Sequence, residues 1–170
     1  MIRRITTDDV ATYRAIRLRA LQDDPSAFGS TYEESLRHAD EVWQDRVASA
    51  AAGTDTVLFL AYDGDECVGL AGAIDDDLGA DRQLISMWVA PPHRGSGVAA
   101  ELVDAVLGWA RDEVGATTVG LWVTRGNDRA QRFYERMGFV ETGDVQPLPS
   151  DPCKDEVRMV FGLRAPSTAG

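Results

Sequence analysis

The sequence predicts a single α/β (α+β) domain over residues 1–170, built from a mixed sheet and about four helices. Strand-like apolar runs alternate with helical segments along the chain, and two of the runs are spaced as a β-hairpin. A chain of 170 residues with 44% apolar side chains can also bury one sizeable core. These observations favour one compact domain that ends in a loose tail over residues 165–170.

The first part of the chain is expected to form a strand followed by two helices. Residues 2–6 are strand-like, and residues 8–22 carry apolar side chains that recur on one helical face. The Pro-containing segment at residues 23–28 breaks this first helix. A second helix is expected over residues 40–51, with Asp40 as its N-cap.

Three strands are expected next. Residues 56–62 and 66–73 flank Asp63-Gly64-Asp65, and a turn of this composition between two apolar runs predicts a hairpin. Residues 83–89 form the following strand, which we expect at the centre of the sheet. The acidic stretch at residues 75–81 is interpreted as a solvated turn.

The second half of the chain continues with a helix, a strand, a helix and two strands. The helix over residues 97–114 is expected to end at Gly115, because glycine suits a left-handed C-cap. Residues 117–123 are strand-like, and a further helix begins at Asn127. The last two strands are expected at residues 139–145 and 156–161.

The sequence MWVAPPHRGSGVA, over residues 87–99, joins an apolar strand to a helix through two prolines and a glycine-rich turn. Backbone N–H groups in the first turn of a helix lack partners and lie at the positive end of the helix dipole, so this turn suits a phosphate. Gly95 and Gly97 allow close backbone approach, and Arg94 adds a charged donor. An ordinary strand-to-helix connection is the alternative.

Two other phosphate-binding motifs do not fit this turn. The P-loop ends in a lysine followed by Ser or Thr, whereas the single lysine of this chain is Lys154, far downstream. The dinucleotide fingerprint has a third glycine, where this helix continues with small residues.

A second motif begins about thirty residues later, where Asn127 starts the sequence NDRAQRFYERMGF. Together, RGxGVA at one helix start and NxxAxxFYxxxGF at the next resemble the acyl-CoA-binding core of the GNAT superfamily of N-acetyltransferases. The resemblance is strongest over residues 83–139. It implies a mixed, mostly antiparallel central sheet of about six to seven strands, flanked by helices and splayed between the fourth and fifth strands.

The resemblance implies acetyl-CoA as co-substrate and assigns residues to it. The backbone of the central strand would bind the pantetheine arm, and an N–H near Val89 would polarise the thioester carbonyl. Tyr134 is the implied general acid, which protonates the departing thiolate. The implied cofactor-binding residues are Met87, Trp88, Val89, Arg94, Gly95, Ser96, Gly97, Val98, Ala99, Ala100 and Asn127. For the side chains of Met87 and Trp88 we expect plain core packing.

The general base is not given by the resemblance, because Gln83 and Trp122 stand where some family members carry glutamate. Carboxylates from the segments that flank the acceptor cleft are the candidates, with a solvated surface role as the alternative for each. They are Glu33, Glu34, Asp155 and Glu156. Glu33 is the tentative base, because it follows an aromatic residue in a Gly/Ser-rich turn; deprotonation by solvent is the other hypothesis.

The predicted function is transfer of an acetyl group from acetyl-CoA to a primary amine by direct attack in a ternary complex. The alternative is a non-catalytic acyl-CoA-binding or sensing module, which the missing glutamates favour and which Asn127 and Tyr134 disfavour. Acidic and aromatic residues at 28–34 and 146–152 favour a cationic acceptor, either a small amine or a peptide amine.

Composition excludes several other classes of function. A net charge of −11 argues against nucleic acid as a partner. Two cysteines with no Cys/His spacing predict free thiols and no metal. The sequence shows no leader and no apolar run of membrane-spanning length, so we expect a cytoplasmic protein without a membrane partner. A homodimer is left open.

Overall fold

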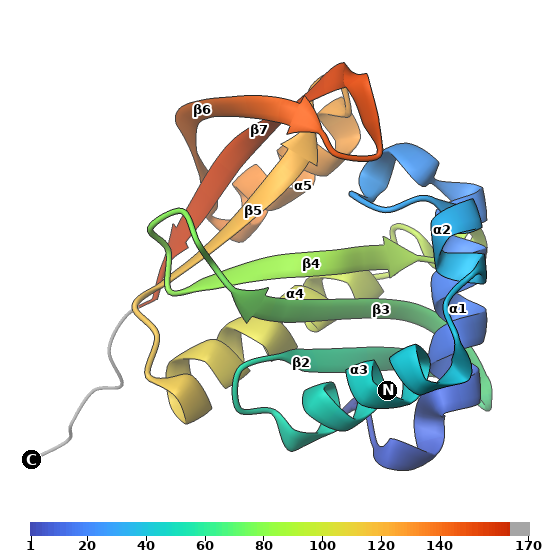
Figure 1. Ribbon diagram of the computed structural model, residues 1–170. Coiled ribbons are helices and arrows are strands. Elements are labelled where there is room, and N and C mark those ends of the chain that lie inside the picture. The colour runs from blue at the N-terminus through green and yellow to red at the C-terminus, as the bar shows by residue number, and fades with distance from the viewer. Residues whose placement is uncertain (164–170) are drawn as a thin grey trace, which may run out of the picture.

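The computed structural model describes residues 1–163, and the tail expected at residues 165–170 lies outside this part. One seven-stranded sheet runs through the domain in the order β1-β2-β3-β4-β5-β7-β6 (Figure 1). The strands are β1 (Ile2–Arg4), β2 (Val57–Asp63), β3 (Glu66–Asp75), β4 (Arg82–Val89), β5 (Thr118–Thr124), β6 (Val140–Leu148) and β7 (Asp151–Gly162). The α-helices are α1 (Val10–Asp23), α2 (Tyr32–Leu36), α3 (Asp40–Ala52), α4 (Val98–Trp109) and α5 (Asp128–Met137).

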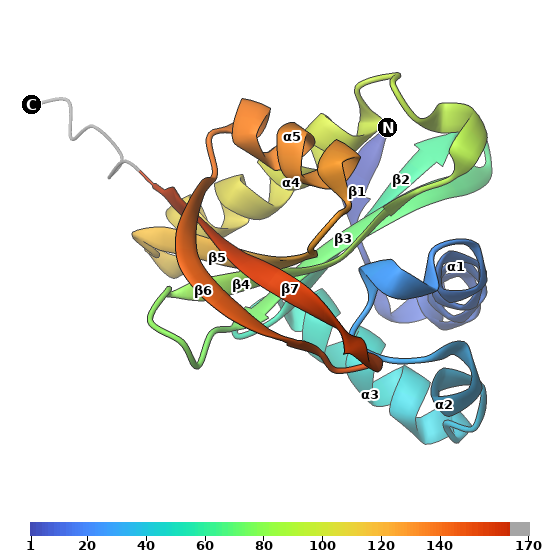
Figure 2. The same cartoon turned by 90° about the horizontal axis from the view of Figure 1, so that it is seen from above.

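Helices cover both faces of the sheet. Seen from above, α1, α2 and α3 lie on one side of the strands, while α4 and α5 lie on the other (Figure 2). The interior strand β3 is buried at six consecutive positions, from Val68 to Ala73, because both of its faces are covered. A single core follows, with Trp43 of α3 and Leu102 of α4 fully buried on the two sides.

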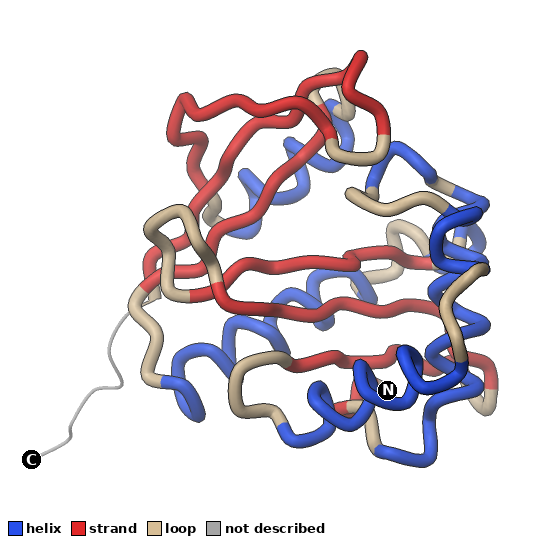
Figure 3. The backbone as a smooth tube through the Cα atoms, in the orientation of Figure 1, coloured by secondary structure: helices blue, strands red, loops and turns tan. Residues whose placement is uncertain are grey.

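The sheet splits between β4 and β5. These two strands are parallel, and they pair only at Arg82 with Val119 and at Gln83 with Gly120. Beyond Gln83 they diverge, so that β5, β7 and β6 form a second half-sheet that turns away from the first (Figure 3). The expected mixed sheet, splayed between the fourth and fifth strands, is confirmed.

A bulge on β4 marks the start of the split. Leu70 of β3 pairs with Trp88, but Gly72 pairs with Ile85, so Ser86 and Met87 together oppose one residue. Ser86 has φ +58°, in the left-handed region that a serine rarely adopts. A bulge of this kind bends its strand and ends regular pairing, which fits its place beside the split.

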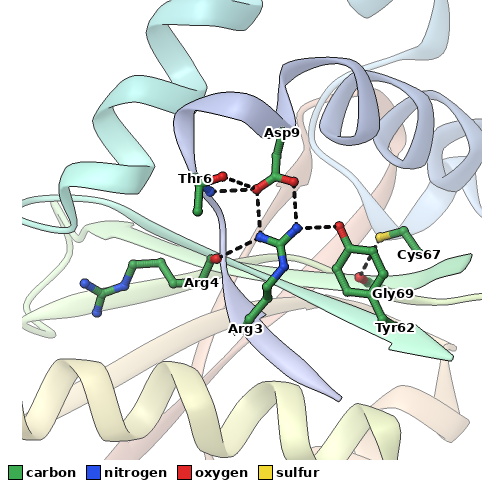
Figure 4. A network of polar contacts seen from close by, with 7 residues as sticks. All are labelled: Arg3, Arg4, Thr6, Asp9, Tyr62, Cys67 and Gly69. Carbon is green, nitrogen blue, oxygen red and sulfur yellow. Dashed lines mark hydrogen bonds and ion pairs between the residues drawn. The ribbon is translucent and has the colours of Figure 1, made fainter. Parts of the chain in front are cut away.

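The link between β1 and α1 is held by a polar network (Figure 4). Arg3 donates to both carboxylate oxygens of Asp9 at 2.7 Å and to the Tyr62 hydroxyl at 2.9 Å. The Thr6 N–H also donates to Asp9, at 2.7 Å. The hydrogen bonds from Arg3 hold the pKa of Asp9 well below its usual range. The network fixes where α1 begins relative to the edge of the sheet.

Most of the expected elements are present, with differences at their ends. The hairpin closes with Asp63 paired to Glu66, and Gly115 ends the fourth helical region in the left-handed conformation with φ +74°. That region changes from α-helix to one π-helical turn over Ala110–Val114. The N-cap of α3 is Ala39 and not Asp40, which is the first residue of the helix. Its carboxylate still suits the positive end of the helix dipole.

Three segments differ more strongly from expectation. Residues 32–36 form α2, a short helix that was not expected although Thr31 and Glu34 have the spacing of a capping box. Much of the segment at 146–152 is strand, since β6 and β7 run up to a turn at Pro149 and Ser150. Asp76 is not solvated: its side chain is fully buried and pairs with Arg158 of β7. A carboxylate in an acidic stretch can therefore be a core ion-pair partner when the opposite strand supplies an arginine.

Within residues 1–163, no helix has the length and apolar character needed to cross a bilayer. The same part of the chain contains no group of three or more His, Cys, Asp or Glu residues placed to hold a metal ion. Cys67 and Cys153 are both free thiols, as expected.

Candidate functional site

The split in the sheet opens into a cleft of about 850 Å³. Its walls come from β4, the start of α4, the end of β5, one face of α5, and the segment 24–30 that follows α1. Beyond Gln83, the edge of β4 that faces this cleft has no pairing with β5. Unpaired backbone groups along that edge can bind an extended ligand.

The glycine-rich turn lies at one end of the cleft. Gly95 and Gly97 have φ +79° and +93°, so each needs the conformational freedom of glycine. A Cβ atom added at either position would meet nothing within 4 Å, which shows that the space in front of the turn is open. Because α4 begins at Val98, the N–H groups of its first turn have no acceptor inside the helix. These features together can accept an anion.

Arg94 is occupied by the protein itself. Its Nε donates to the carbonyl oxygen of Val89 at 2.9 Å, and its Nη2 donates to the carboxylate of Asp23 at 2.5 Å. The same Asp23 oxygen accepts from the indole of Trp88 at 2.9 Å. The side chain of Arg94 therefore ties the turn to the ends of β4 and α1, and the backbone N–H groups that begin α4 are available donors at this end of the cleft.

The cleft brings most of the sequence-predicted binding residues together. Ser96 and Val98 are not among its lining residues. The Ser96 hydroxyl donates to the His93 carbonyl oxygen at 2.5 Å, and Val98 packs against the core. The predicted residues that do line the cleft are Met87, Trp88, Val89, Arg94, Gly95, Gly97, Ala99, Ala100, Asn127 and Tyr134.

Asn127 and Tyr134 lie at opposite ends of α5. Asn127 is the N-cap of the helix, where its Oδ1 accepts from the Ala130 N–H at 3.2 Å. Tyr134 is 8% exposed and packs edge-on against Phe139, with ring centroids 5.6 Å apart. Burial raises the pKa of Tyr134, so its phenol stays protonated at neutral pH. A protonated phenol that lines the cleft is suited to donate a proton there.

The four candidate carboxylates occupy very different places. Glu33, the tentative base, is exposed on α2 and does not line the cleft. Glu34 is used in a capping box, where it accepts from the Thr31 N–H at 2.9 Å. Asp155 is exposed and pairs with Arg125 at 3.6 Å.

Glu156 alone of these four lines the cleft. It is 7% exposed, and its Oε1 accepts from the side-chain amide of Gln146 at 2.6 Å. Burial raises the pKa of Glu156, which makes its carboxylate a stronger base than an exposed one.

Sequence reasoning missed a buried charged group in the cleft, Arg17. It is 9% exposed and donates to the hydroxyls of Ser30 and Ser86, both at 2.8 Å. A signal was present, because Arg17 lies four residues from both Tyr13 and Leu21, on the apolar face of the first helix. Arginine is rarely buried on the apolar face of a helix unless its charge is compensated, so its position there indicates a specific role.

Positive charge also lines the cleft beside the glycine-rich turn. Arg129 and Arg136 on α5 are exposed lining residues, and neither forms an ion pair with any residue in the part of the chain that the structure covers. The domain as a whole carries a net charge of −11, so this wall is locally basic against an acidic background. Such a wall attracts anionic ligands.

The motifs and the split sheet agree with a match to a known family. Residues 17–139 match the family model described as Acetyltransferase (GNAT) family. The chain belongs to the GNAT family. An uncharacterized N-acetyltransferase of Mycobacterium tuberculosis is 40% identical over 87 residues, which cover 51% of this GNAT chain and 54% of that protein. The chain thus matches about half the length of this curated relative.

Solved structures share the GNAT fold over nearly the whole chain. The protein yncA from Salmonella typhimurium, with its cofactor acetyl-CoA, has a TM-score of 0.77 at 17% identity, covering 100% of this chain and 97% of that one. Spermidine N-acetyltransferase from Vibrio cholerae, in complex with CoA and spermine, has a TM-score of 0.74 at 17% identity, covering 96% and 95%. At these identities the likeness establishes the fold of this GNAT domain.

Proposed function

We propose that this protein transfers an acetyl group from acetyl-CoA to an amine that binds in the same cleft. The observation that carries the proposal is that one cleft joins an open glycine-rich helix start, an unpaired strand edge, a protonated tyrosine and a buried glutamate. Each of these supplies one requirement of acyl transfer to an amine.

The residues present fit acetyl-CoA. The backbone N–H groups at the start of α4 would hold its pyrophosphate, because Gly95 and Gly97 leave the approach open. The edge of β4 from Met87 to Val89 would bind the pantetheine arm, and the N–H of Val89 would polarise the carbonyl. Asn127 holds the first turn of α5 in place beside this path. Bound acetyl-CoA would supply the acetyl thioester that the amine attacks.

Two side chains then handle the protons. Glu156 takes a proton from the acceptor amine, directly or through water, and its raised pKa makes it a stronger base than an exposed carboxylate. The Tyr134 hydroxyl donates its proton to the departing sulfur, and its burial keeps that proton in place until then. In this proposal Glu156 replaces Glu33 as the base, since Glu33 lies outside the cleft.

A binding or sensing module without catalysis is the second candidate. The observation in its favour is that Gln83 and Trp122, which cannot ionise, line the cleft where the resemblance would allow a glutamate. The two candidates differ in whether bound acetyl-CoA is consumed.

Thiol release from acetyl-CoA, measured with a panel of amines, tests the proposal. Glu156→Gln should lower kcat/KM by ~10²- to 10⁴-fold, as expected for loss of a general base. The matched control is Glu33→Gln, which removes an exposed carboxylate and should leave the rate unchanged. Calorimetry should give the same acetyl-CoA affinity for both variants and for the unmodified protein.

The pH dependence adds an independent reading. With Glu156 as the base, kcat/KM falls as the pH drops through the raised pKa of this carboxyl, whichever amine is used. With solvent as the base, the inflection follows the pKa of the amine instead. Tight binding of acetyl-CoA without thiol release from any amine would establish the binding module.

A further inference from the structure

Arg17 is a buried cation at the acceptor side of the cleft. It projects from the covered face of α1, and its guanidinium lies 4.6 Å from the centre of the Phe28 ring. Its two terminal nitrogens donate to the hydroxyl oxygens of Ser30 and Ser86, while its Nε is buried and has no partner within residues 1–163. All of its protein partners are therefore neutral.

A buried guanidinium without a counter-ion is costly. Burial lowers the pKa of Arg17, and the titratable side chains that act on it or feel it are Tyr13, His38 and Arg46, none of which is a carboxylate. Asp24 also lines the cleft, but its carboxylate accepts from the Ser26 hydroxyl at 3.3 Å and makes no ion pair with Arg17. By contrast, the other buried arginine in the described part of the chain, Arg158, pairs with Asp76.

The groups around Arg17 are arranged to receive an anion. The hydroxyls of Ser30 and Ser86 accept from Arg17, so the hydrogen of each is free to donate, and neither donates to another residue in the described part. Two donating hydroxyls beside a guanidinium suit a carboxylate.

The surroundings hold these groups in place. The segment that carries Phe28 and Ser30 lines the cleft and is tied to the second half-sheet. Thr124 donates to the Ser26 carbonyl oxygen and Ser150 donates to the Phe28 carbonyl oxygen, both at 2.5 Å. A site fixed from both half-sheets needs little reorganisation when a ligand binds.

We propose that Arg17, together with Ser30 and Ser86, binds a carboxylate of the acceptor, and that the acceptor is therefore an amino acid or a similar small molecule with both an amine and a carboxylate. This inference rests on the proposed acetyl transfer and adds the substrate class to it. The amine of such a molecule is directed to Glu156, which lines the same cleft from β7. The carboxylate of the acceptor is then bound by the guanidinium of Arg17, and its amine faces the carboxylate of Glu156.

Matched acceptor pairs test the inference. Each L-amino acid is compared with the amine left by removing its carboxylate, and thiol release from acetyl-CoA is measured for both. We expect at least one amino acid to exceed its paired amine in kcat/KM by ~30-fold or more, the scale for losing one partner of a buried charged contact. Arg17→Met should abolish that preference. Arg14→Met, which removes an exposed arginine from the same helix, should retain it.

A measurement without turnover keeps the inference separate from the proposed function. N-acetyl amino acids, the products expected here, should raise the melting temperature of the unmodified protein but not that of Arg17→Met. Arg17→Met itself should melt no lower than the unmodified protein, because an unpaired buried charge does not stabilise a fold. Melting well below it would mark Arg17 as structural and overturn the inference.

Two further outcomes would overturn it. One is turnover of carboxylate-free amines, such as spermine, with no better rate for any amino acid. The other is equal stabilisation of the unmodified protein and Arg17→Met by N-acetyl amino acids, or stabilisation of neither. Failure of acetyl transfer would appear differently, as absence of acetyl-CoA binding or of thiol release with every amine, while carboxylate binding could still be measured without CoA.

Discussion

Removing one partner of the buried pair between Asp76 and Arg158 should be strongly destabilising, and Asp76→Asn tests this. Asp76 lies in the connection from β3 to β4, with its side chain fully buried, while Arg158 of β7 is 3% exposed. The same carboxylate accepts from the backbone N–H of Ala80 at 3.0 Å, so it also holds the connection together. Asn keeps the shape but leaves the guanidinium as an uncompensated buried charge.

The expected loss follows from that burial. Removing one partner of a buried pair costs about 3–5 kcal/mol. For a chain of this size each kcal/mol shifts Tm by about 2–4 °C, so we expect a fall of roughly 6–20 °C. The loss is large because Arg158 has no other anion to pair with in the described part of the chain. Its Nη1 has no hydrogen-bond partner there, and its side chain lies against Gly120 on the neighbouring strand.

Thermal and urea unfolding measure the effect, with two comparison variants. Glu66→Gln removes a carboxylate from the exposed pair with Arg19 and should cost less than about 1 kcal/mol. Asp76→Leu combined with Arg158→Met removes both charges and should recover much of the loss, because no buried charge is left unpaired. If Asp76→Asn costs no more than Glu66→Gln, the Arg158 charge is solvated and this reasoning is refuted.

Three further outcomes are expected. Gly97→Val should weaken acetyl-CoA binding more than tenfold in calorimetry. Gly143→Val changes a glycine with nearly the same φ of +91° at an irregularity within β6 that does not line the cleft, so it should cost similar strain of about 1–3 kcal/mol but leave that affinity unchanged. Tyr134→Phe should slow thiol release by ~10²- to 10⁴-fold with little change in acetyl-CoA affinity; an unaltered rate would reduce Tyr134 to packing. Asp9 has a lowered pKa when folded, so the stability it contributes is present above its unfolded pKa of about 3.9 and is lost as the pH falls below it. Asp9→Asn should therefore cost about 1–2 kcal/mol at pH 7 and progressively less as the pH falls from about 4 towards 2, and a constant cost in acid unfolding titrations would contradict this.

The sequence by itself determined the features that depend on short stretches of chain. The turn at Gly95 and Gly97 requires positive φ values that only glycine adopts readily, and the left-handed end of a helix at Gly115 follows the same rule. The hairpin at Gly64 and the alternation of strands and helices are likewise encoded by local periodicity. The two helix-start motifs together span 46 residues, from Arg94 to Phe139, and they were enough to indicate the family.

One local feature was readable but was not used. Thr31 and Glu34 have the spacing of a capping box, which predicts a helix start, and α2 begins there. Glu34 accepts a hydrogen bond from the Thr31 N–H and does not line the cleft, so it is not placed to act as the base. The capping-box spacing alone could therefore have removed Glu34 from the four candidate bases.

The tertiary structure decided which charges meet in the cleft. Glu33 and Glu156 are both acidic residues outside the two helix-start motifs, and only the register of β7 against β5 and β6 buries Glu156 beside the split. Arg17 and Ser86 are 69 residues apart in the chain, and Asp76 and Arg158 are 82 apart. Burial, pKa shifts and ion pairing arise from such distant contacts, because the dielectric around a charge is set by all the elements packed against it and not by its neighbours in sequence.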